Sequence, residues 1–216
     1  MAVIIDGNSV ITSPLSVGFG GSNDIASVAV GYQALTANTT GNQNVGIGYQ
    51  SLFGNTTGYN NTSIGFQAGY SQTTGFANTY VGYIAGYANT TGSYNVAVGN
   101  YALTNNTASQ NTAVGLDALR FNTSGTPNDA FGFQALRSNT TGTNNVAIGY
   151  QALYTNTTGT QNAAIGQGAL YTNSNGSSNT SMGVYSLYNN TASNNTAVGY
   201  KALNQNTTGT PNDAFG

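Results

Sequence analysis

The clearest pattern along the chain is a short alternation of apolar and small residues that recurs every 16 or 17 positions. One unit is Asn-Val-Ala-Ile-Gly-Tyr at residues 145–150, in which Val146 and Ile148 share one face of an extended segment and Ala147 lies on the other. This alternation predicts a short β-strand in each unit. The Ala-Leu pair that follows predicts a second short strand. The Asn-Thr-Thr-Gly tetrapeptide predicts a turn, because Asn and Gly tolerate positive φ and Thr bonds nearby backbone.

A glycine marks the same place in every unit, and the residues around it occupy fixed columns. An apolar residue precedes it, Ala or Ser stands three positions after it, and Leu stands four after it except where Gly69 and Gly86 replace the Leu. The marker glycines follow one another at the repeat period, and the two shorter steps end at Gly115 and Gly199. The full set is Gly31, Gly48, Gly65, Gly82, Gly99, Gly115, Gly132, Gly149, Gly166, Gly183, Gly199 and Gly216.

Two short strands and two turns in each repeat unit describe one coil of a parallel β-solenoid or β-roll. A single coil cannot bury its apolar face, so the coils must stack. The sequence therefore predicts an all-β fold of about twelve 16–17-residue coils, a rod of roughly 55–60 Å at about 4.8 Å per coil. We expect residues 27–216 to form this shaft and residues 1–26 to form an N-terminal attachment or capping segment. Within the shaft, we expect the Val/Ile and Leu columns to point inward as apolar ladders.

An asparagine stands four positions before the marker glycine in every unit after the first. Stacked at the spacing of the coils, these amides are expected to form a hydrogen-bonded ladder that satisfies buried polar groups of the turns. The predicted structural ladder is Asn44, Asn61, Asn78, Asn95, Asn111, Asn128, Asn145, Asn162, Asn179, Asn195 and Asn212.

The composition narrows the function. Only 4% of the 216 residues are charged, and the chain contains no His, Cys or Trp. Zinc and other transition-metal sites therefore lack their usual ligands, and three cations are too few to follow a nucleic-acid backbone. No long apolar run predicts membrane insertion, and five scattered Asp give little for acid–base catalysis. We predict a protein that is not an enzyme and that uses no cofactor and no metal. Arg120 and Arg137 share a column on adjacent coils, so we expect them to splay into solvent.

Two protein families resemble this repeat. The segment Asn-Asn-Val-Ala-Ile-Gly at residues 144–149 resembles the head repeats of trimeric autotransporter adhesins, which are parallel β-rolls assembled as trimers. The longer unit at residues 195–209 is similar to repeats of bacteriophage tail-fibre proteins, and residues 4–12 look similar to the start of many phage fibre proteins. Residues 1–26 lack the basic and apolar regions of a secretory signal, which favours the fibre. A C-terminal chaperone removed after assembly is a further expectation from this resemblance.

The resemblance implies a homotrimeric virion fibre for host attachment, bound to other virion proteins through its N-terminal segment. The alternative is a bacterial surface adhesin, located on the cell surface. A column of small residues offers a smooth face on which three copies could pack, although the same residues would also fit inside a narrow single-chain coil. This column includes Ala113, Ala130, Ala147, Ala164, Ser181 and Ala197.

Three sets of surface residues are candidates for binding. Tyr154, Tyr171 and Tyr188 follow the Leu column and could contact a host glycan, or they could shield a corner of the solenoid. A second aromatic set is expected to lie in the core or in a trimer interface, and comprises Tyr32, Tyr49, Phe66, Tyr83 and Tyr150. Turn threonines such as Thr140, Thr157 and Thr207 raise the alternative of an ice-binding solenoid, which their position in a turn disfavours. The sequons at Asn38, Asn55, Asn89, Asn139, Asn156 and Asn206 are interpreted as products of the turn repeat rather than glycan acceptors.

Overall fold

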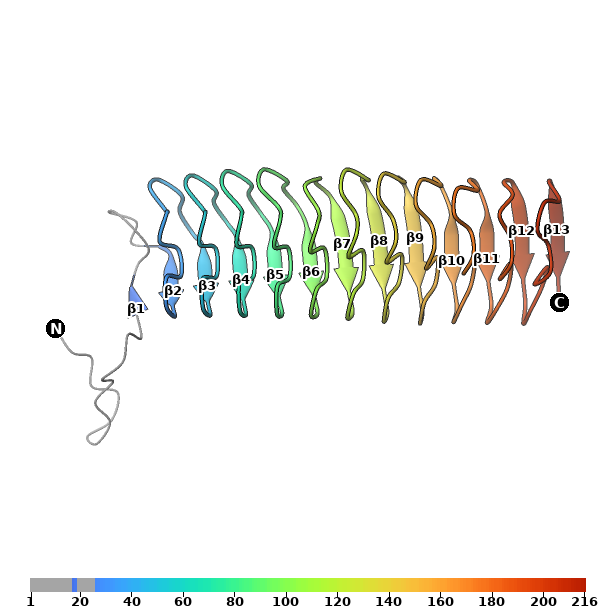
Figure 1. The fold of residues 1–216 in the computed structure, drawn as a ribbon, viewed down its shortest axis with the longest axis horizontal. Coiled ribbons are helices and arrows are strands. Elements are labelled where there is room, and N and C mark those ends of the chain that lie inside the picture. The colour runs from blue at the N-terminus through green and yellow to red at the C-terminus, as the bar shows by residue number, and fades with distance from the viewer. Residues whose placement is uncertain (1–16, 19–25) are drawn as a thin grey trace, which may run out of the picture.

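The chain folds as a parallel β-solenoid, a rod of about twelve stacked coils with one strand per coil (Figure 1). A computed structural model describes residues 17–18 and 26–216. Apart from residues 17–18 and 26, the predicted N-terminal segment 1–26 lies outside the described residues. The strands are β1 (Val17–Gly18), β2 (Val28–Val30), β3 (Val45–Ile47), β4 (Thr62–Ile64), β5 (Thr79–Val81), β6 (Val96–Val98), β7 (Asn111–Val114), β8 (Asn128–Phe131), β9 (Asn145–Ile148), β10 (Ala163–Ile165), β11 (Thr180–Met182), β12 (Asn195–Val198) and β13 (Asn212–Phe215).

The strands of the described residues form one sheet whose order is the order of the chain. From β2 to β13 the pairing is parallel, and equivalent residues of successive coils face one another, as Ala147 faces Ala164 and Ile148 faces Ile165. β1 runs antiparallel to β2, with Val17 opposite Val30. β1 therefore covers the strand edge that the first coil would otherwise present, and uncovered edges invite pairing with other chains.

The prediction of a second strand at the Ala-Leu pair is wrong, because this segment is a turn. Gln151 and Leu153, which flank Ala152, have φ of 53° and 51°. A strand cannot contain these left-handed residues, and they turn the backbone so that the Leu side chain points into the coil. Hydrogen bonds still link these turns between coils, for example from Leu136 N to Ala152 O at 2.9 Å.

The core consists of leucine from the turn and alanine from the strand. Leu153 and Ala147 are both fully buried, and the same holds for their equivalents in most coils. The predicted inward Val/Ile column is therefore wrong, since Ile148 is 40% exposed on the outer face of the sheet. The physical reason is the width of the coil. Leucine from the opposite wall fills the interior, so only a small side chain fits on the inward face of the strand.

The marker glycine is required by both conformation and space. At Gly149 φ is +133°, and a Cβ built there would lie 2.7 Å from the backbone C and O of Gly166 in the next coil. The other marker glycines have φ between +129° and +138°. The backbones of adjacent coils approach each other too closely at this position to leave room for a side chain. This close approach explains why every unit has glycine in this column.

The two coils that lack the core leucine are repacked around one tyrosine. Tyr80 takes the place of the strand alanine and is 1% exposed, with its ring lying in the space that Gly69 and Gly86 leave. A Cβ at Gly86 would lie 2.4 Å from the Tyr80 ring. Asn89 donates a hydrogen bond of 2.6 Å to the Tyr80 hydroxyl. Burial raises the pKa of this hydroxyl far above its ordinary value, so it remains a neutral part of the core.

Candidate functional site

The predicted asparagine column forms a continuous hydrogen-bonded ladder along the inside of the rod. Asn145 Oδ1 accepts hydrogen bonds from Asn162 N at 3.0 Å and from Asn162 Nδ2 at 3.1 Å. Asn145 Nδ2 donates to Gly159 O at 2.9 Å. Bonds of the same kind from the backbone N–H to the preceding amide recur along most of the predicted column. These amides therefore replace the missing backbone partners at the start of each strand.

A second amide column, which the sequence analysis did not identify as structural, lies beside the first. Asn156 Nδ2 donates to Asn139 Oδ1 at 2.9 Å and to Gly159 O at 3.0 Å, so both columns meet at the same turn carbonyl. Gln72 takes this place in one coil and reaches Gly75 O at 3.0 Å. The signal in the sequence was the regular spacing of these asparagines. They are Asn38, Asn55, Asn89, Asn106, Asn122, Asn139, Asn156, Asn173, Asn190 and Asn206.

This second column contains the sequon asparagines. Asn38, Asn55, Asn89, Asn139 and Asn156 are all buried. Their amides already hold the turn together, and a glycan on Asn156 would have to replace the hydrogen bonds of that amide. This position favours the interpretation that the sequons follow from the turn repeat.

The turn threonines bond to the neighbouring coil. Thr140 Oγ1 donates to Thr157 O at 3.0 Å, and Thr157 Oγ1 donates to Ser174 O at 3.0 Å. Thr207 accepts the equivalent bond from Thr191 at its carbonyl, at 2.8 Å. These hydroxyls point along the rod toward the next coil, whereas an ice-binding surface requires an outward array.

The tyrosines after the leucine column form stacked ladders on the flank. The ring centroids of Tyr154 and Tyr171 are 5.1 Å apart, and those of Tyr171 and Tyr188 are 4.9 Å apart, with interplanar angles of 4° and 5°. Phe53, Tyr70 and Tyr87 stack in the same way nearer the N-terminus. Desolvation raises the pKa of Tyr171, and its tyrosine neighbours, led by Tyr188, raise it further.

The aromatic set that follows the marker glycine also stacks, but it lies outside the core. Tyr49 and Tyr150 are 43% and 50% exposed, and Tyr32, Phe66 and Tyr83 are similarly exposed. Of the two predicted places for these rings, the core is therefore wrong, and the trimer interface stays a prediction. Leucine already fills the interior, so the rings stack on one another at the surface, as Phe133 and Tyr150 do at 5.1 Å.

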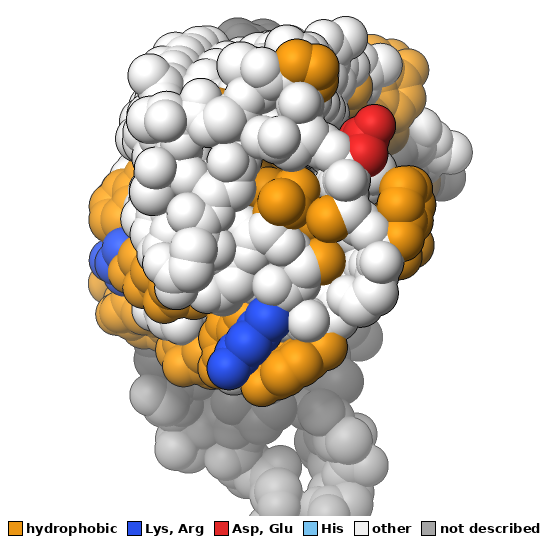
Figure 2. Space-filling view, turned by 90° about the vertical axis from the view of Figure 1, so that its right-hand side faces the viewer, with side chains coloured by type: hydrophobic (Ala, Val, Ile, Leu, Met, Phe, Trp, Pro, Cys, Tyr) orange, Lys and Arg blue, Asp and Glu red, His pale blue; other side chains and the backbone are white. Residues whose placement is uncertain are grey.

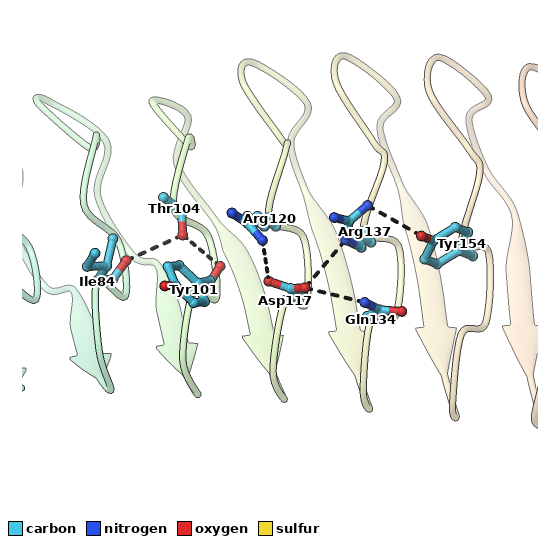
Figure 3. A network of polar contacts seen from close by, with 8 residues as sticks. All are labelled: Ile84, Tyr101, Thr104, Asp117, Arg120, Gln134, Arg137 and Tyr154. Carbon is cyan, nitrogen blue, oxygen red and sulfur yellow. Dashed lines mark hydrogen bonds and ion pairs between the residues drawn. The ribbon is translucent and has the colours of Figure 1, made fainter.

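A cluster of charged side chains lies midway along the rod (Figure 3). Arg120 Nη1 is 3.0 Å from Asp117 Oδ1, and Arg137 Nε is 3.5 Å from Asp117 Oδ2. Arg137 also lies over the Phe121 ring, 4.7 Å from its centroid, and its Nη1 donates to the Tyr154 hydroxyl at 3.4 Å. The expectation that the two arginines splay into solvent is wrong. One buried carboxylate lies between them and reduces their repulsion, and this cluster continues into the tyrosine ladder.

The outer face of the sheet carries an apolar column along the length of the rod. Ile148, Met182 and Phe131 are 40%, 43% and 40% exposed, and each stands immediately before a marker glycine. The small-residue column considered as a trimer face, which includes Ala147, is buried inside the coil, as its alternative interpretation held. Seen along the rod from the C-terminal end, hydrophobic side chains gather in several groups around the rim, with few charges among them (Figure 2).

These features define a parallel β-solenoid in which one chain builds every coil. The aromatic, apolar and charged side chains on its flanks form columns along the rod. Within residues 17–18 and 26–216, no helix is long and apolar enough to cross a membrane, and no three His, Cys, Asp or Glu side chains gather as a metal site. Comparison with family models, with curated proteins and with solved structures found no match. The argument for function therefore depends on the surface of the rod itself.

Proposed function

We propose that this chain is the shaft of a phage tail fibre or a related virion appendage, in which three copies associate into a rigid rod that serves host attachment. The N-terminal segment would join the rod to other virion proteins. The function is mechanical, since the rod would hold a host-binding region at a distance from the particle.

The observation that carries this proposal is the apolar column on the outer face of the sheet. An apolar residue precedes the marker glycine in every coil, although it lies on the outer face of the strand. Its side chain is exposed in six coils and half-buried in the other six. Exposed apolar stripes of this kind are typical of protein–protein interfaces. A column that repeats with every coil would pack against the same column of a second and a third copy along the whole rod.

The interior of the rod supports a mechanical role. Two amide columns, the leucine and alanine core, and backbone bonds between turns link each coil to the next. Such a structure resists local opening because each coil is held by both of its neighbours. The scarcity of charge fits this arrangement, since like charges in one column would repel at the spacing of the coils.

The mass in solution tests the proposal. Light scattering is expected to give three times the 22.0 kDa mass of one chain. Ile148→Asp places a charge in the exposed apolar column and is expected to shift the mass to that of a single chain, with the circular dichroism spectrum unchanged. The control is Thr158→Asp, which places the same charge on an exposed turn. A wild-type mass of 22.0 kDa would overturn the trimeric shaft, and a trimer that tolerates Ile148→Asp would overturn the apolar column as its interface.

A bacterial surface adhesin is the second candidate, and the half-buried tyrosine ladders on the flank favour it. An adhesin binds its target along its own flank, and stacked Tyr154, Tyr171 and Tyr188 offer such a surface. Neighbouring genes distinguish the two candidates. Baseplate or neck genes beside this one would support the virion fibre, and a secretion signal or envelope anchor in the same gene product would support the adhesin.

A further inference from the structure

One column of the solenoid is interrupted at Gly168. Two positions after the marker glycine, neighbouring coils carry glutamines that bond to one another, with Gln151 Nε2 donating to Gln134 Oε1 at 2.9 Å. In the next coil this position is Gly168, and the ladder loses a side chain. A partly open cavity of about 130 Å³ lies at the gap. It is lined by Tyr150, Gln151, Gln167, Gly168, Tyr171, Tyr185 and Tyr188, which we call the Gly168 cleft.

The walls of the Gly168 cleft hold one another in place. Tyr171 and Tyr188 stack face to face, and Tyr185 meets Tyr188 edge to face, with centroids 5.5 Å apart at 75°. Gln167 Nε2 donates to the Tyr185 hydroxyl at 2.9 Å. A ligand would therefore meet groups that are already ordered, which lowers the entropic cost of binding.

Tyr150 supplies an aromatic face to the cleft. Phe133 of the preceding coil stacks on one side of Tyr150 at 5.1 Å. In the following coil the equivalent residue is Gln167, so the other face of Tyr150 has no stacked ring among the described residues. The Tyr150 ring is 50% exposed and lines the cleft.

The chemistry of the lining selects the class of ligand. Neutral phenol and amide groups both donate and accept hydrogen bonds, and none of the seven lining residues carries a formal charge at neutral pH. Tyr171 is stacked on both faces, by Tyr154 and by Tyr188, so it presents its edge and hydroxyl, which suit a polyol better than a cation. A ligand with one flat apolar face and several hydroxyls matches Tyr150 together with these groups.

We propose that the Gly168 cleft binds one sugar ring of a neutral glycan, stacked on Tyr150 and hydrogen-bonded by the surrounding amides and phenols. The volume of about 130 Å³ is close to the roughly 150 Å³ of a cavity that accepts one benzene ring. The rest of the glycan would lie along the ladder of Tyr154, Tyr171 and Tyr188. This site goes beyond the mechanical role of the shaft, and it needs no trimer for its lining, which one chain supplies completely.

Two variants address the cleft in different ways. Gly168→Gln restores the glutamine of the preceding coils, where Gln134 and Gln151 adopt φ of 55° and 53°, close to the +62° of Gly168. Its side chain would occupy the cleft, and the ring of Tyr185, 2.8 Å from the new Cβ, would have to move. Tyr150→Ala instead removes the aromatic face and leaves the gap open.

The matched control is Tyr49→Ala. Tyr49 stands in the same column as Tyr150 and is 43% exposed, but rings stack on both of its faces. No gap adjoins it in the glutamine column, since Gln50 and Gln67 bond to each other at 2.8 Å. Tyr49→Ala therefore removes an equivalent ring without altering the Gly168 cleft.

The test is saturation-transfer NMR on the full chain with the methyl glycosides of glucose, galactose, mannose and N-acetylglucosamine, and with choline and glucose 6-phosphate as charged probes. We expect transfer to at least one neutral glycoside, with affinity reduced about tenfold or more in Gly168→Gln and Tyr150→Ala and unchanged in Tyr49→Ala. Transfer to no neutral glycoside, transfer to choline alone, or equal affinity in Tyr150→Ala would overturn the site. Light scattering of the same samples reports assembly separately, so failure of the cleft and failure of the trimer are distinguishable.

Discussion

The asparagine ladder can be tested at Asn145, in the middle of the rod. In Asn145→Ala the backbone N–H of Asn162 loses its side-chain acceptor, and hydrogen bonds to Gly159 O, Asn128 Oδ1 and Asn162 Nδ2 disappear. Gly159 O keeps its bond from Asn156, so the groups left without that partner are two buried donors of Asn162, its backbone N–H and one hydrogen of Nδ2. Two orphaned buried donors cost about 1–3 kcal/mol each and the two other lost bonds about 1 kcal/mol each, so the expected loss of stability is about 4–8 kcal/mol.

Asn145→Asp keeps the hydrogen-bond acceptor of this side chain and removes its donor. The introduced carboxyl still accepts from Asn162, but when ionised it turns an oxygen toward Gly159 O and Asn128 Oδ1, where the amide had donated. Burial beside two acceptors raises the pKa of the introduced carboxyl above its unfolded value of about 3.9. The folded state then holds the proton more tightly than the unfolded state. The stability of this variant relative to wild type is therefore greatest below that value and falls as pH rises through the folded pKa.

The assay is urea unfolding followed by far-UV circular dichroism at several pH values, with hydrogen exchange to locate the weakened coils, because a repeat array can unfold in parts. The control is Asn175→Asp, at an exposed turn position where the expected change is within about 0.5 kcal/mol. A loss below about 1 kcal/mol in Asn145→Ala, less than one buried orphan group costs, would refute the reasoning. So would an Asn145→Asp variant whose stability relative to wild type does not depend on pH.

Three further predictions concern the core, the backbone and the charged cluster. Tyr80→Ala loses about 3–5 kcal/mol by leaving a cavity, and Gly86→Leu loses about 1–3 kcal/mol or more by a clash with the Tyr80 ring. In a double-mutant cycle measured by denaturant unfolding, the double variant recovers part of the summed loss; additive losses would contradict this account. Gly149→Ala, at a φ of +133°, loses at least about 3 kcal/mol of stability. Gly46→Ala, at a position that holds Ala in other coils, stays within about 1 kcal/mol of wild type. Equal urea midpoints for these two variants would contradict the requirement for glycine at position 149. Asp117→Asn loses about 1 kcal/mol of stability relative to wild type. Added salt narrows this difference in stability, because it screens the charges of the two arginines. A difference that does not depend on salt would argue against the shared ion pair.

The repeat in the sequence was sufficient to predict the solenoid. Its period, the alternation within each strand and the Asn-Thr-Thr-Gly turn are local signals, and the parallel stack of about twelve coils follows from them. The candidate sites were less predictable. Tyr154, Tyr171 and Tyr188 stood out as a column, but the Gly168 cleft depends on residues of three successive coils, and Asp117 was recognised as the partner of two arginines only in the folded chain.

The sequence by itself determined the number of coils, the position of the strand before each marker glycine and the amide column, because stacking aligns residues of equal register whatever the shape of the coil. The second strand predicted at the Ala-Leu pair is a turn. Only the tertiary structure decided which face of the strand is inside. An alternating pattern has two faces, and Ile148 is more hydrophobic than Ala147, yet Leu153 reaches across the narrow coil and leaves room for alanine alone. The larger apolar side chains consequently lie on the surface of the rod. Which side chains point into the coil was decided by the space between its two walls. A local sequence pattern gives no information about that space.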